Sequence, residues 1–408
     1  MRLRTLLVLF LVIAFALPQA ATGAPDDKVV RFATFNASLN RNFAGQLVED
    51  LSTPNNAQAA TVAEIIQRVR PDVVLINEFD FVANDVALEL FQENYLSVAH
   101  NGADPIEYPF AFTAPSNTGI PSGFDLNNNG EVGGPDDAFG FGFFPGQFGM
   151  AVYSMFPIDF DEIRTFQLFL WEDMPGALLP DDPNTPAPAD WYSPAELDVF
   201  RLSSKSHWDI PIEIGKATVR FLVSHPTPPV FDGPEDRNGT RNFDEIRFWA
   251  DYITPARSGY IYDDEGVSGG LKPGELFVIA GDQNSDPVDG DSIPGSIQQL
   301  IEHPLVNVKV TPESAGAVEA ASTQGGANNS HEGDPRFDTA DFSDTAPGNL
   351  RADYVLPVKR LQIVDSAVFW PLASDPLFRL TGTFPFPSSD HRLVWIDVSH
   401  GKFQAIDR

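Results

Sequence analysis

The sequence predicts an α/β fold, and two observations support this class. Short apolar runs rich in β-branched residues, which are typical of buried strands, recur along the chain. Amphipathic stretches with helical spacing lie between some of these runs. Strand and helix signals that alternate in this way are typical of a domain in which sheets and helices pack in layers. The runs expected to form strands are 29–35, 73–76, 219–223, 276–280, 354–358 and 393–398.

Two segments carry the clearest helical pattern. In 57–70, apolar residues such as Val62 and Ile66 lie on one face, and Pro71 ends the helix because it cannot continue the hydrogen-bond ladder. In 242–253, apolar residues recur with similar spacing after a turn-rich segment. Both segments are expected to cover a sheet with their apolar faces.

Two further segments do not follow this alternation. Segment 108–148 is dense in Gly, Phe, Pro and Asn, and segment 314–348 is polar and poor in large apolar residues. Both are expected to be long loops, which in compact domains are usually functional or mobile. Strand signals needed for the core lie on both sides of each, so we expect one domain, 25–408, rather than two joined by a linker.

The amino terminus has the pattern of a secretory signal peptide, expected over 1–24. Arg2 and Arg4 precede the apolar run 6–17, and small residues follow it. The run is shorter than the roughly 20 residues that a membrane-spanning helix needs, although a retained N-terminal anchor is the alternative. We therefore expect a secreted protein, extracellular or periplasmic, whose mature part has no stable membrane span.

The composition restricts the chemistry. The chain has no cysteine, so disulfides and thiolate catalysis are excluded. Its formal net charge is −31, which repels polyanions at long range and offers no basic stripe for a phosphate backbone. Such a surface suits divalent cations. The charge weighs against a general nucleic-acid binder, although a metal-filled site could still act on nucleic acid locally.

Polar residues of catalytic type lie at or just beyond the ends of the apolar runs. Strand ends are where α/β folds normally assemble a site, so these side chains are candidates for one centre. They are Asn36, Glu78, His225, Asp282, Asn284, Asp353, Asp390 and His391.

This ordered set resembles the motifs of the endonuclease/exonuclease/phosphatase superfamily. The motifs that carry the resemblance span the chain in the family's order, and include Gly-Asp282-Gln-Asn284, Asp353-Tyr-Val-Leu and Ser-Asp390-His391. The resemblance implies a four-layered α/β sandwich, in which two packed, mostly antiparallel sheets are flanked by helices. It also implies metal-dependent hydrolysis of a phosphoester, at a site that opens at one end of the sandwich.

The resemblance implies a role for each motif, and the chemistry agrees with these roles. Glu78 and Asp390 are oxygen ligands of the type that Mg²⁺ or Mn²⁺ prefers, and Asn36 and waters would complete the shell. Asp282, with Asn284 two residues on, would orient and activate the attacking water. The alternative for Asp282 is a residue that only closes a turn.

The two histidines of the set have different expected roles. Asp353 would bind His391 and fix its tautomer, so that His391 could stabilise the reacting phosphorus or assist proton transfer. His225 would donate a hydrogen bond to a phosphate oxygen, whereas a histidine at this position without the other motifs would as readily be a structural residue.

Arg237 and Arg241 follow His225 in the sequence and are candidates for substrate binding. Guanidinium groups match phosphate oxygens, so both residues could clamp a substrate phosphate. The alternative is a helix entry with local ion pairs, and the sequence does not decide between the two.

A second metal site is a hypothesis for the first long loop. Asp125, Asn127, Asn129 and Gly130 fit the first half of an EF-hand-type calcium loop, but Asp136 stands where a glutamate is usual. A structural Ca²⁺ and an ion-free Asn/Gly turn are both open. Segment 331–341 could likewise form a wall of the pocket, hold a further cation, or be a polar loop held by local hydrogen bonds.

These observations favour a secreted, metal-dependent phosphoester hydrolase that acts by direct in-line attack of water. The absence of a basic surface favours small or lipid-derived phosphoesters as substrates. One alternative is a secreted nuclease that cleaves DNA or RNA. A second is a catalytically silent binding module of the same fold, which would have no chemical reason to keep the whole set of polar residues.

Overall fold

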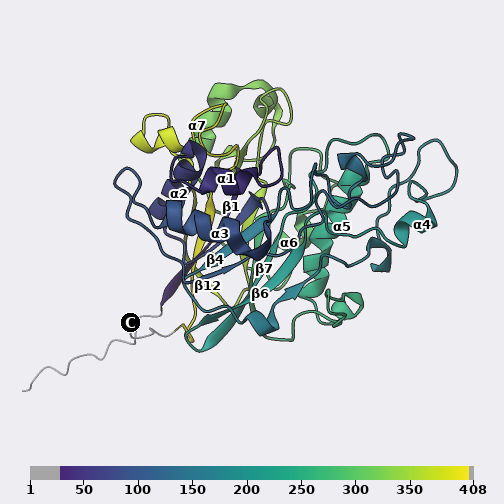
Figure 1. Ribbon diagram of the computed structural model, residues 1–408, viewed down its shortest axis with the longest axis horizontal. Helices are drawn as coiled ribbons and strands as arrows, with labels where there is room; N and C mark the ends of the chain where they lie inside the picture. The colour runs from purple at the N-terminus through teal and green to yellow at the C-terminus, as the bar shows by residue number, and fades with distance from the viewer. Residues whose placement is uncertain (1–27, 404–408) are drawn as a thin grey trace, which may run out of the picture.

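The computed structural model of the 408-residue chain describes residues 28–403 (Figure 1). The signal peptide expected over 1–24 lies outside the described residues, so its prediction stays a prediction. Within 28–403, no helix is both long and apolar enough to cross a membrane.

The first sheet contains strands from both ends of the chain. Its order is β12-β13-β1-β2-β4-β3, and β1 and β2 run parallel while the other neighbours run antiparallel. The strands are β1 (Val29–Leu39), β2 (Val73–Phe79), β3 (Phe110–Phe112), β4 (Met150–Ser154), β12 (Gln362–Val368) and β13 (Val394–Ser399).

The second sheet has the order β11-β8-β7-β6-β5. Here β7 and β8 are the parallel pair, and the remaining neighbours are antiparallel. A short antiparallel pair, β9 (Ala340–Asp341) with β10 (Asn349–Leu350), lies apart from both sheets. The strands of the second sheet are β5 (Arg164–Thr165), β6 (His207–Ile214), β7 (Ala217–Ser224), β8 (Leu276–Asp282) and β11 (Asp353–Pro357).

The alternation of side chains along β1 explains how the layers are built. Val30 and Phe32 belong to the core between the sheets, where the ring of Phe32 lies 5.5 Å from that of Phe221 on β7. Ala33 and Phe35 point to the opposite face and belong to a second core that includes residues of the neighbouring helices. Successive strand residues face opposite sides of a sheet, so one strand contributes to both cores.

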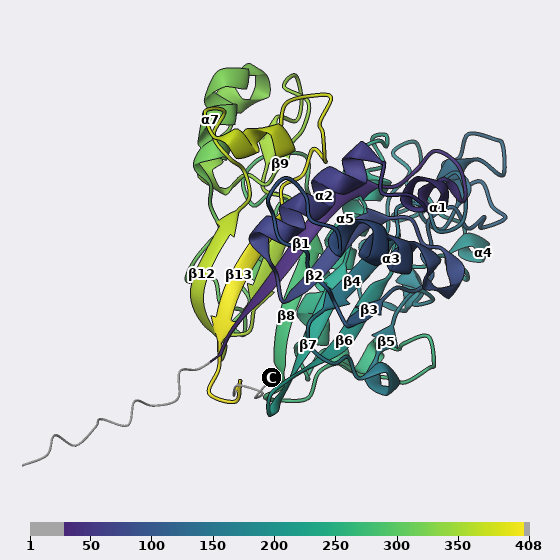
Figure 2. The same cartoon turned by 60° about the vertical axis from the view of Figure 1, so that its left-hand side comes forward.

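Helices cover the outer faces of both sheets. Figures 1 and 2 show α1, α2 and α3 together over the first sheet, and Figure 1 shows α5 next to β7 of the second. Trp249 of α5 donates from its indole nitrogen to the Ser224 hydroxyl at the end of β7, at 3.0 Å. The helices are α1 (Gln46–Leu51), α2 (Ala57–Val69), α3 (Val86–Phe91), α4 (Pro194–Leu197), α5 (Arg237–Tyr252), α6 (Gln298–Ile301) and α7 (Ala315–Gln324).

The predicted fold class is confirmed: the chain is α/β, with two packed, mostly antiparallel sheets flanked by helices. Each of the six expected strands is present, and α2 and α5 cover the two expected helical segments. The prediction of one long loop over 314–348 is wrong in part, because α7 occupies 315–324. The Ser314 side chain caps this helix by accepting from the Ala317 amide, but its small residues gave no amphipathic pattern to detect.

Candidate active site

The pairing of the strands brings the predicted site residues to one end of the sandwich. In the parallel pair β1–β2, Asn36 is opposite Asn77, so Asn36 and Glu78 share the carboxyl edge of these strands. In the antiparallel pair β8–β11, Asp282 is directly opposite Asp353. Strand register therefore positions four residues that are far apart in the sequence.

The segment before β13 completes the cluster, because β13 runs antiparallel to β1 and begins where β1 carries its polar residues. The hydroxyl groups of Ser38 and Ser389 lie 2.9 Å apart. Ser38 also donates to Asp390 at 3.5 Å. These contacts hold Asp390 and His391 beside the end of β1.

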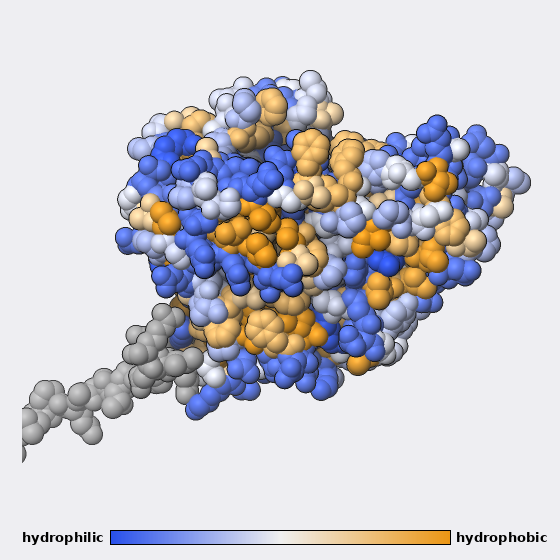
Figure 3. Space-filling view, in the orientation of Figure 1, coloured by the Kyte–Doolittle hydropathy of each residue, from blue (hydrophilic) through white to orange (hydrophobic). Residues whose placement is uncertain are grey.

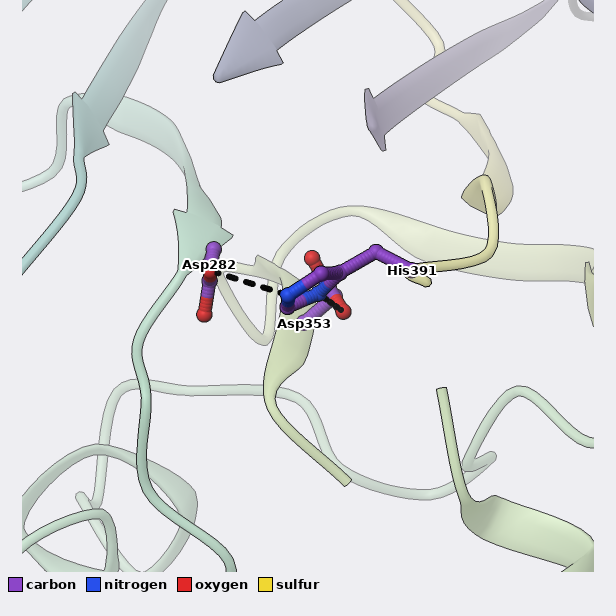
Figure 4. Close-up of side chains that lie close together, drawn as sticks. All are labelled: Asp282, Asp353 and His391. Carbon is purple, nitrogen blue, oxygen red and sulfur yellow. Dashed lines mark hydrogen bonds and ion pairs between the residues drawn. The ribbon is translucent and has the colours of Figure 1, made fainter. Parts of the chain in front are cut away.

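Asp353, His391 and Asp282 form a continuous carboxylate–imidazole–carboxylate arrangement (Figure 4). His391 Nδ1 lies 2.8 Å from Asp353 Oδ2, and its Nε2 lies 3.6 Å from Asp282 Oδ2. Burial alone would lower the pKa of His391, but the carboxylates of Asp353 and Asp282 outweigh it and hold this pKa well above its usual value. His391 is therefore an imidazolium at neutral pH in this cluster.

Asp282 is the centre of the cluster and is almost completely buried. Its Oδ2 accepts from the Asn36 amide at 3.0 Å and lies 3.4 Å from His225 Nε2. Its Oδ1 accepts from the backbone amide of Asn284 at 2.9 Å. Burial raises the pKa of Asp282 to about 6, and the positive charge of His391 opposes this rise. Such a carboxylate is a base matched to near-neutral pH.

His225 lies against Asp282 and is also buried. Burial lowers the pKa of His225 well below its usual value, and the nearby positive charge of Lys205 lowers it further, so the ring is neutral. Its Nδ1 is buried and has no hydrogen-bond partner within the described residues. Burying a polar atom without a hydrogen-bond partner costs folding free energy. Such an atom at a site is therefore a candidate for contact with a ligand.

Two site residues have backbone conformations that ordinary residues rarely adopt. Glu78 has a φ of 58° and Asn284 a φ of 49°, both in the left-handed region. The Asn36 amide donates to Glu78 at 3.1 Å, and the Asn284 side chain donates to the Pro226 carbonyl at 3.1 Å. At Glu78 this conformation is strained and persists because the surroundings impose it, as at many functional sites, whereas asparagine adopts it more readily.

The residues predicted to bind metal fit a hard divalent cation. Burial raises the pKa of Glu78, and the negative charge of Asp390 raises it further, so the two carboxylates repel each other across the site. A cation between them would remove this repulsion with oxygen ligands, which Mg²⁺ and Mn²⁺ prefer. Asn36 is placed beside them, where its amide nitrogen joins Glu78 to Asp282 and its oxygen accepts from the Ser38 amide.

Arg237 and Arg241 line a cavity next to the cluster, but both already have protein partners. Arg237 pairs with the carboxylate of Glu235. The Arg241 guanidinium is buried and donates to backbone carbonyls, among them that of Leu202 at 2.8 Å. Their predicted role as a phosphate clamp stays a prediction, and in this arrangement each would have to exchange or share its partners.

In the loop around Asp125, side-chain oxygens accept from backbone amides. Asp125 accepts from the amides of Asn129 and Gly130, at 3.0 and 2.7 Å. Asn127 and Asn129 accept from amides two residues further on. These contacts are those of a polar turn, and each oxygen keeps further lone pairs. Calcium binding by Asp125, Asn127 and Asn129 stays a prediction.

Segment 331–341 packs directly against the catalytic cluster at its C-terminal end. The hydroxyl group of Thr339 donates to Asp353 Oδ2 at 2.8 Å, the same oxygen that His391 contacts. The amide of Asp341 donates to the Asp390 carbonyl at 2.7 Å, and its carboxylate binds the buried guanidinium of Arg392. Thr339 and Asp341 thus help to position the cluster, and a pocket wall formed by segment 331–341 stays a prediction.

Sequence reasoning missed two residues of the site, Lys205 and Asn77. Lys205 is buried and lines the cavity beside Glu78 and His225, and its ammonium group makes no hydrogen bond or ion pair within the described residues. Burial lowers the pKa of Lys205. The sequence around Lys205 offered no signal for this role, because it lies between serines and before β6, which was not among the expected strands.

Asn77 connects the two sheets at the site. Its side-chain oxygen accepts from the amide of Asp282 at 3.2 Å, and its amide nitrogen donates to the carbonyl of Ser224 at 3.4 Å. Being next to Glu78 in a buried strand was the only indication of this role in the sequence.

Comparison with known proteins gives one family. A family model described as "Endonuclease/Exonuclease/phosphatase family" matches residues 33–391, which is most of the chain. No curated protein sequence matches the chain with significance.

Solved structures resemble the chain at low sequence identity. An endonuclease/exonuclease/phosphatase from Beutenbergia cavernae has 16% identity and a TM-score of 0.48, and the match covers 91% of this chain and 72% of that one. Sphingomyelinase C from Streptomyces griseocarneus has 13% identity and a TM-score of 0.43, with 91% and 99% covered. Beta toxin from Staphylococcus aureus has 13% identity and a TM-score of 0.42, with 90% and 99% covered.

Proposed function

The chain belongs to the endonuclease/exonuclease/phosphatase family, and from this premise we propose that it is a divalent-metal-dependent phosphoester hydrolase. The observation that carries the proposal is the buried arrangement of Asp353, His391 and Asp282, in which one imidazole is held between two carboxylates. Hydrolysis needs a base for water and a donor for the developing charge, and this arrangement supplies both.

Asp282 is proposed to accept the proton of the attacking water. Its pKa of about 6 leaves it ionised at neutral pH, yet basic enough to take a proton in the transition state. The amide of Asn284 holds one carboxylate oxygen, and Asn36 holds the other. These contacts fix the orientation of the Asp282 carboxylate.

His391 is proposed to donate from Nε2 to the charge that develops on the phosphoryl group. Asp353 fixes its orientation through Nδ1 and favours the charged form. The neutral His225 and the ammonium group of Lys205 lie on the cavity side of the cluster, where both could bind non-bridging phosphate oxygens.

Glu78 and Asp390 would hold Mg²⁺ or Mn²⁺, with Asn36 beside them. When bound, the ion would supply Lewis acidity and neutralise charge on the phosphate. The residues of the chain set its place, because Glu78 is fixed at the end of β2 and Ser38 contacts Asp390.

We propose small phosphoesters as substrates, including esters derived from lipids, and secretion as the destination of the protein. The formal net charge of −31 opposes the approach of a polynucleotide. A nuclease is the alternative, and it predicts activity on DNA that falls steeply with salt, because phosphate contacts release counterions.

The proposal is tested by hydrolysis of bis-p-nitrophenyl phosphate, p-nitrophenyl phosphate and plasmid DNA. Purified protein without residues 1–24 is assayed in EDTA, Mg²⁺, Mn²⁺ or Ca²⁺. Asp282→Ala and His391→Ala are compared with wild type. His100→Gln serves as the histidine control, because within residues 28–403 the His100 ring makes a hydrogen bond only to the Tyr95 carbonyl.

Metal-restored turnover that both site variants lose and the control keeps would support the proposal. Turnover that survives both site variants would place the active site elsewhere. Absence of turnover on all three substrates in every metal would instead favour the silent binding module.

A further inference from the structure

A cavity of about 550 Å³ opens beside the catalytic cluster and shares residues with it. Glu78, Lys205 and His225 form the end nearest the cluster. A volume of this size is typical of sites that enclose a small molecule. The phosphoryl group occupies only a small part of such a space, so the remainder is available to another part of the substrate.

The walls away from the cluster are mainly apolar and aromatic. They come from three separate segments: the Gly/Phe-rich loop, the segment before β6 and the loop after His225. The rings of Tyr192 and Phe200 stack with centroids 4.8 Å apart. Phe141 and Phe231 stand at the mouth, where 49% and 86% of their surfaces are exposed. Figure 3 shows that hydrophobic residues form patches among hydrophilic ones on the face that it draws.

Both arginines of the walls have protein partners. Arg237 pairs with Glu235, and Arg241 donates to backbone carbonyls while its guanidinium lies 4.7 Å from the Phe200 ring centroid. Of the lysine and arginine side chains that line the cavity, only Lys205 has no such partner within residues 28–403. The two ends of the cavity thus differ. The ammonium group of Lys205 lies at the catalytic end, and the surface of the other end is mainly apolar.

The geometry points to a binding subsite for the alcohol part of the substrate: the cavity takes a bulky, mainly apolar alcohol group of a small phosphoester, of the size of one or two aromatic rings. This inference rests on the proposed function, because it places the phosphoryl group at Lys205 and His225. It excludes a second phosphate in the cavity, since the apolar end offers no free cation to bind one.

The test compares methyl, benzyl and 2-naphthylmethyl phosphates, whose alcohols differ in apolar area but little in acidity. Binding is measured by calorimetry with Mg²⁺ on Asp282→Asn, and hydrolysis on wild type. Burial of one or two rings should lower Kd and KM by roughly 10- to 100-fold from the methyl to the naphthylmethyl ester. Equal values for the three esters would overturn the inference.

Two variants and a matched control locate the effect in the cavity. Ala138→Phe fills the space between the walls, and should remove the advantage of the naphthylmethyl ester while the methyl ester is still hydrolysed. Phe231→Ala should reduce that advantage by roughly 3- to 10-fold. Phe384→Ala is the control, because Phe384 is 84% exposed and is not part of the cavity wall. An equal loss in Phe384→Ala and Phe231→Ala would overturn the inference.

Failure of the inference and failure of the proposed function give different results. Turnover that is insensitive to the alcohol group would leave the hydrolase standing and overturn the subsite. Graded binding without turnover of these esters, and without turnover of bis-p-nitrophenyl phosphate or DNA, would support the subsite and contradict the hydrolase. Hydrolysis of a dinucleotide with kcat/KM tenfold above that of the naphthylmethyl ester would overturn the assignment of an apolar alcohol.

Discussion

His391 Nδ1 lies 2.8 Å from Asp353 Oδ2, and both residues are almost completely buried. The contact joins the segment before β13 of the first sheet to β11 of the second. It keeps Nδ1 protonated and directs Nε2 towards Asp282. Asp353 acts through His391 and is a positioning residue of the site.

Asp353→Asn should lower kcat by about 10²- to 10⁴-fold with little change in KM, because His391 would lose both its orientation and its charge. The pKa of His391 should fall towards its usual value, and NMR titration of the ring would detect the fall. Thr339→Val, which removes the second contact to the same carboxylate, should cost less, about 10-fold. Unchanged kcat in Asp353→Asn would show that His391 does not depend on this contact.

Activity should fall as the pH decreases through about 6, where Asp282 takes up a proton. A base works only when ionised, so kcat/KM should drop about 10-fold per pH unit below that value. The profile is measured at saturating Mg²⁺, with circular dichroism at each pH to show that the fold persists. If the fold persists and the acidic fall in kcat/KM has its midpoint below pH 4.5, Asp282 is excluded as the base.

Glu78→Gln should stabilise the metal-free protein and abolish its response to metal. Burial and the charge of Asp390 both raise the pKa of Glu78, so removal of its charge relieves repulsion. The expected rise in Tm in EDTA is roughly 1–3 °C. Added Mg²⁺ should raise the Tm of wild type only. Equal stabilisation of both proteins by Mg²⁺ would place the ion elsewhere.

The stability of the fold should decrease as the pH falls from 6.5 towards 4 because of His207. Burial lowers the pKa of His207 from 6.5 to about 4. Its Nδ1 lies 3.0 Å from the Ser203 hydroxyl, and its Nε2 lies 2.9 Å from the Glu245 carbonyl, which suits the neutral ring. The unfolded chain therefore binds a proton in this range that the folded chain does not.

This stability is fully present above pH 6.5, and about 2 kcal/mol of it should be lost between pH 7.5 and pH 5. Urea unfolding at the two pH values measures the loss. His207→Asn should be less stable at pH 7.5 but should show a smaller difference between the two pH values. An equal difference in both proteins would assign the pH dependence to other groups.

Calcium should raise the Tm of the protein if the loop around Asp125 binds it, and Asp125→Asn should remove the rise. Carboxylate and amide oxygens in this spacing are ligands that Ca²⁺ accepts. Asp182→Asn is the matched control, because Asp182 also closes an exposed turn by accepting from the Asn184 amide. The Tm is measured in thermal melts with millimolar Ca²⁺ and, for comparison, with Mg²⁺. A rise in Tm with Ca²⁺ that persists in Asp125→Asn would exclude this loop as the calcium site.

The part of the site that sequence could predict lies at strand ends. Asn36, Glu78 and Asp282 follow apolar runs that are unmistakable as buried strands, and their chemistry matches one reaction. Their convergence depends on register, such as Asp282 opposite Asp353, which no local pattern encodes. Only the family resemblance predicted that these residues lie together in one site.

The residues that sequence reasoning missed act through tertiary contacts. Lys205 stands among serines, and its burial arises from segments contributed by distant parts of the chain. Asn77 occupies an apolar strand, where its side chain is satisfied only by the other sheet. For Arg241, charge suggested a phosphate ligand, but the structure places its guanidinium on backbone carbonyls.

In the first sheet, β13 lies between β12 and β1. Strands β12 and β13 come from the C-terminal part of the chain, and β1 comes from the N-terminal part. His391 reaches Asp353 and Asp282 only once this strand has been inserted. A complete but only partly folded chain therefore has every catalytic side chain but no reaction centre. The rate at which enzymatic turnover recovers during refolding would then report the rate at which β13 docks. Spectroscopic probes of helix content would not detect this docking step.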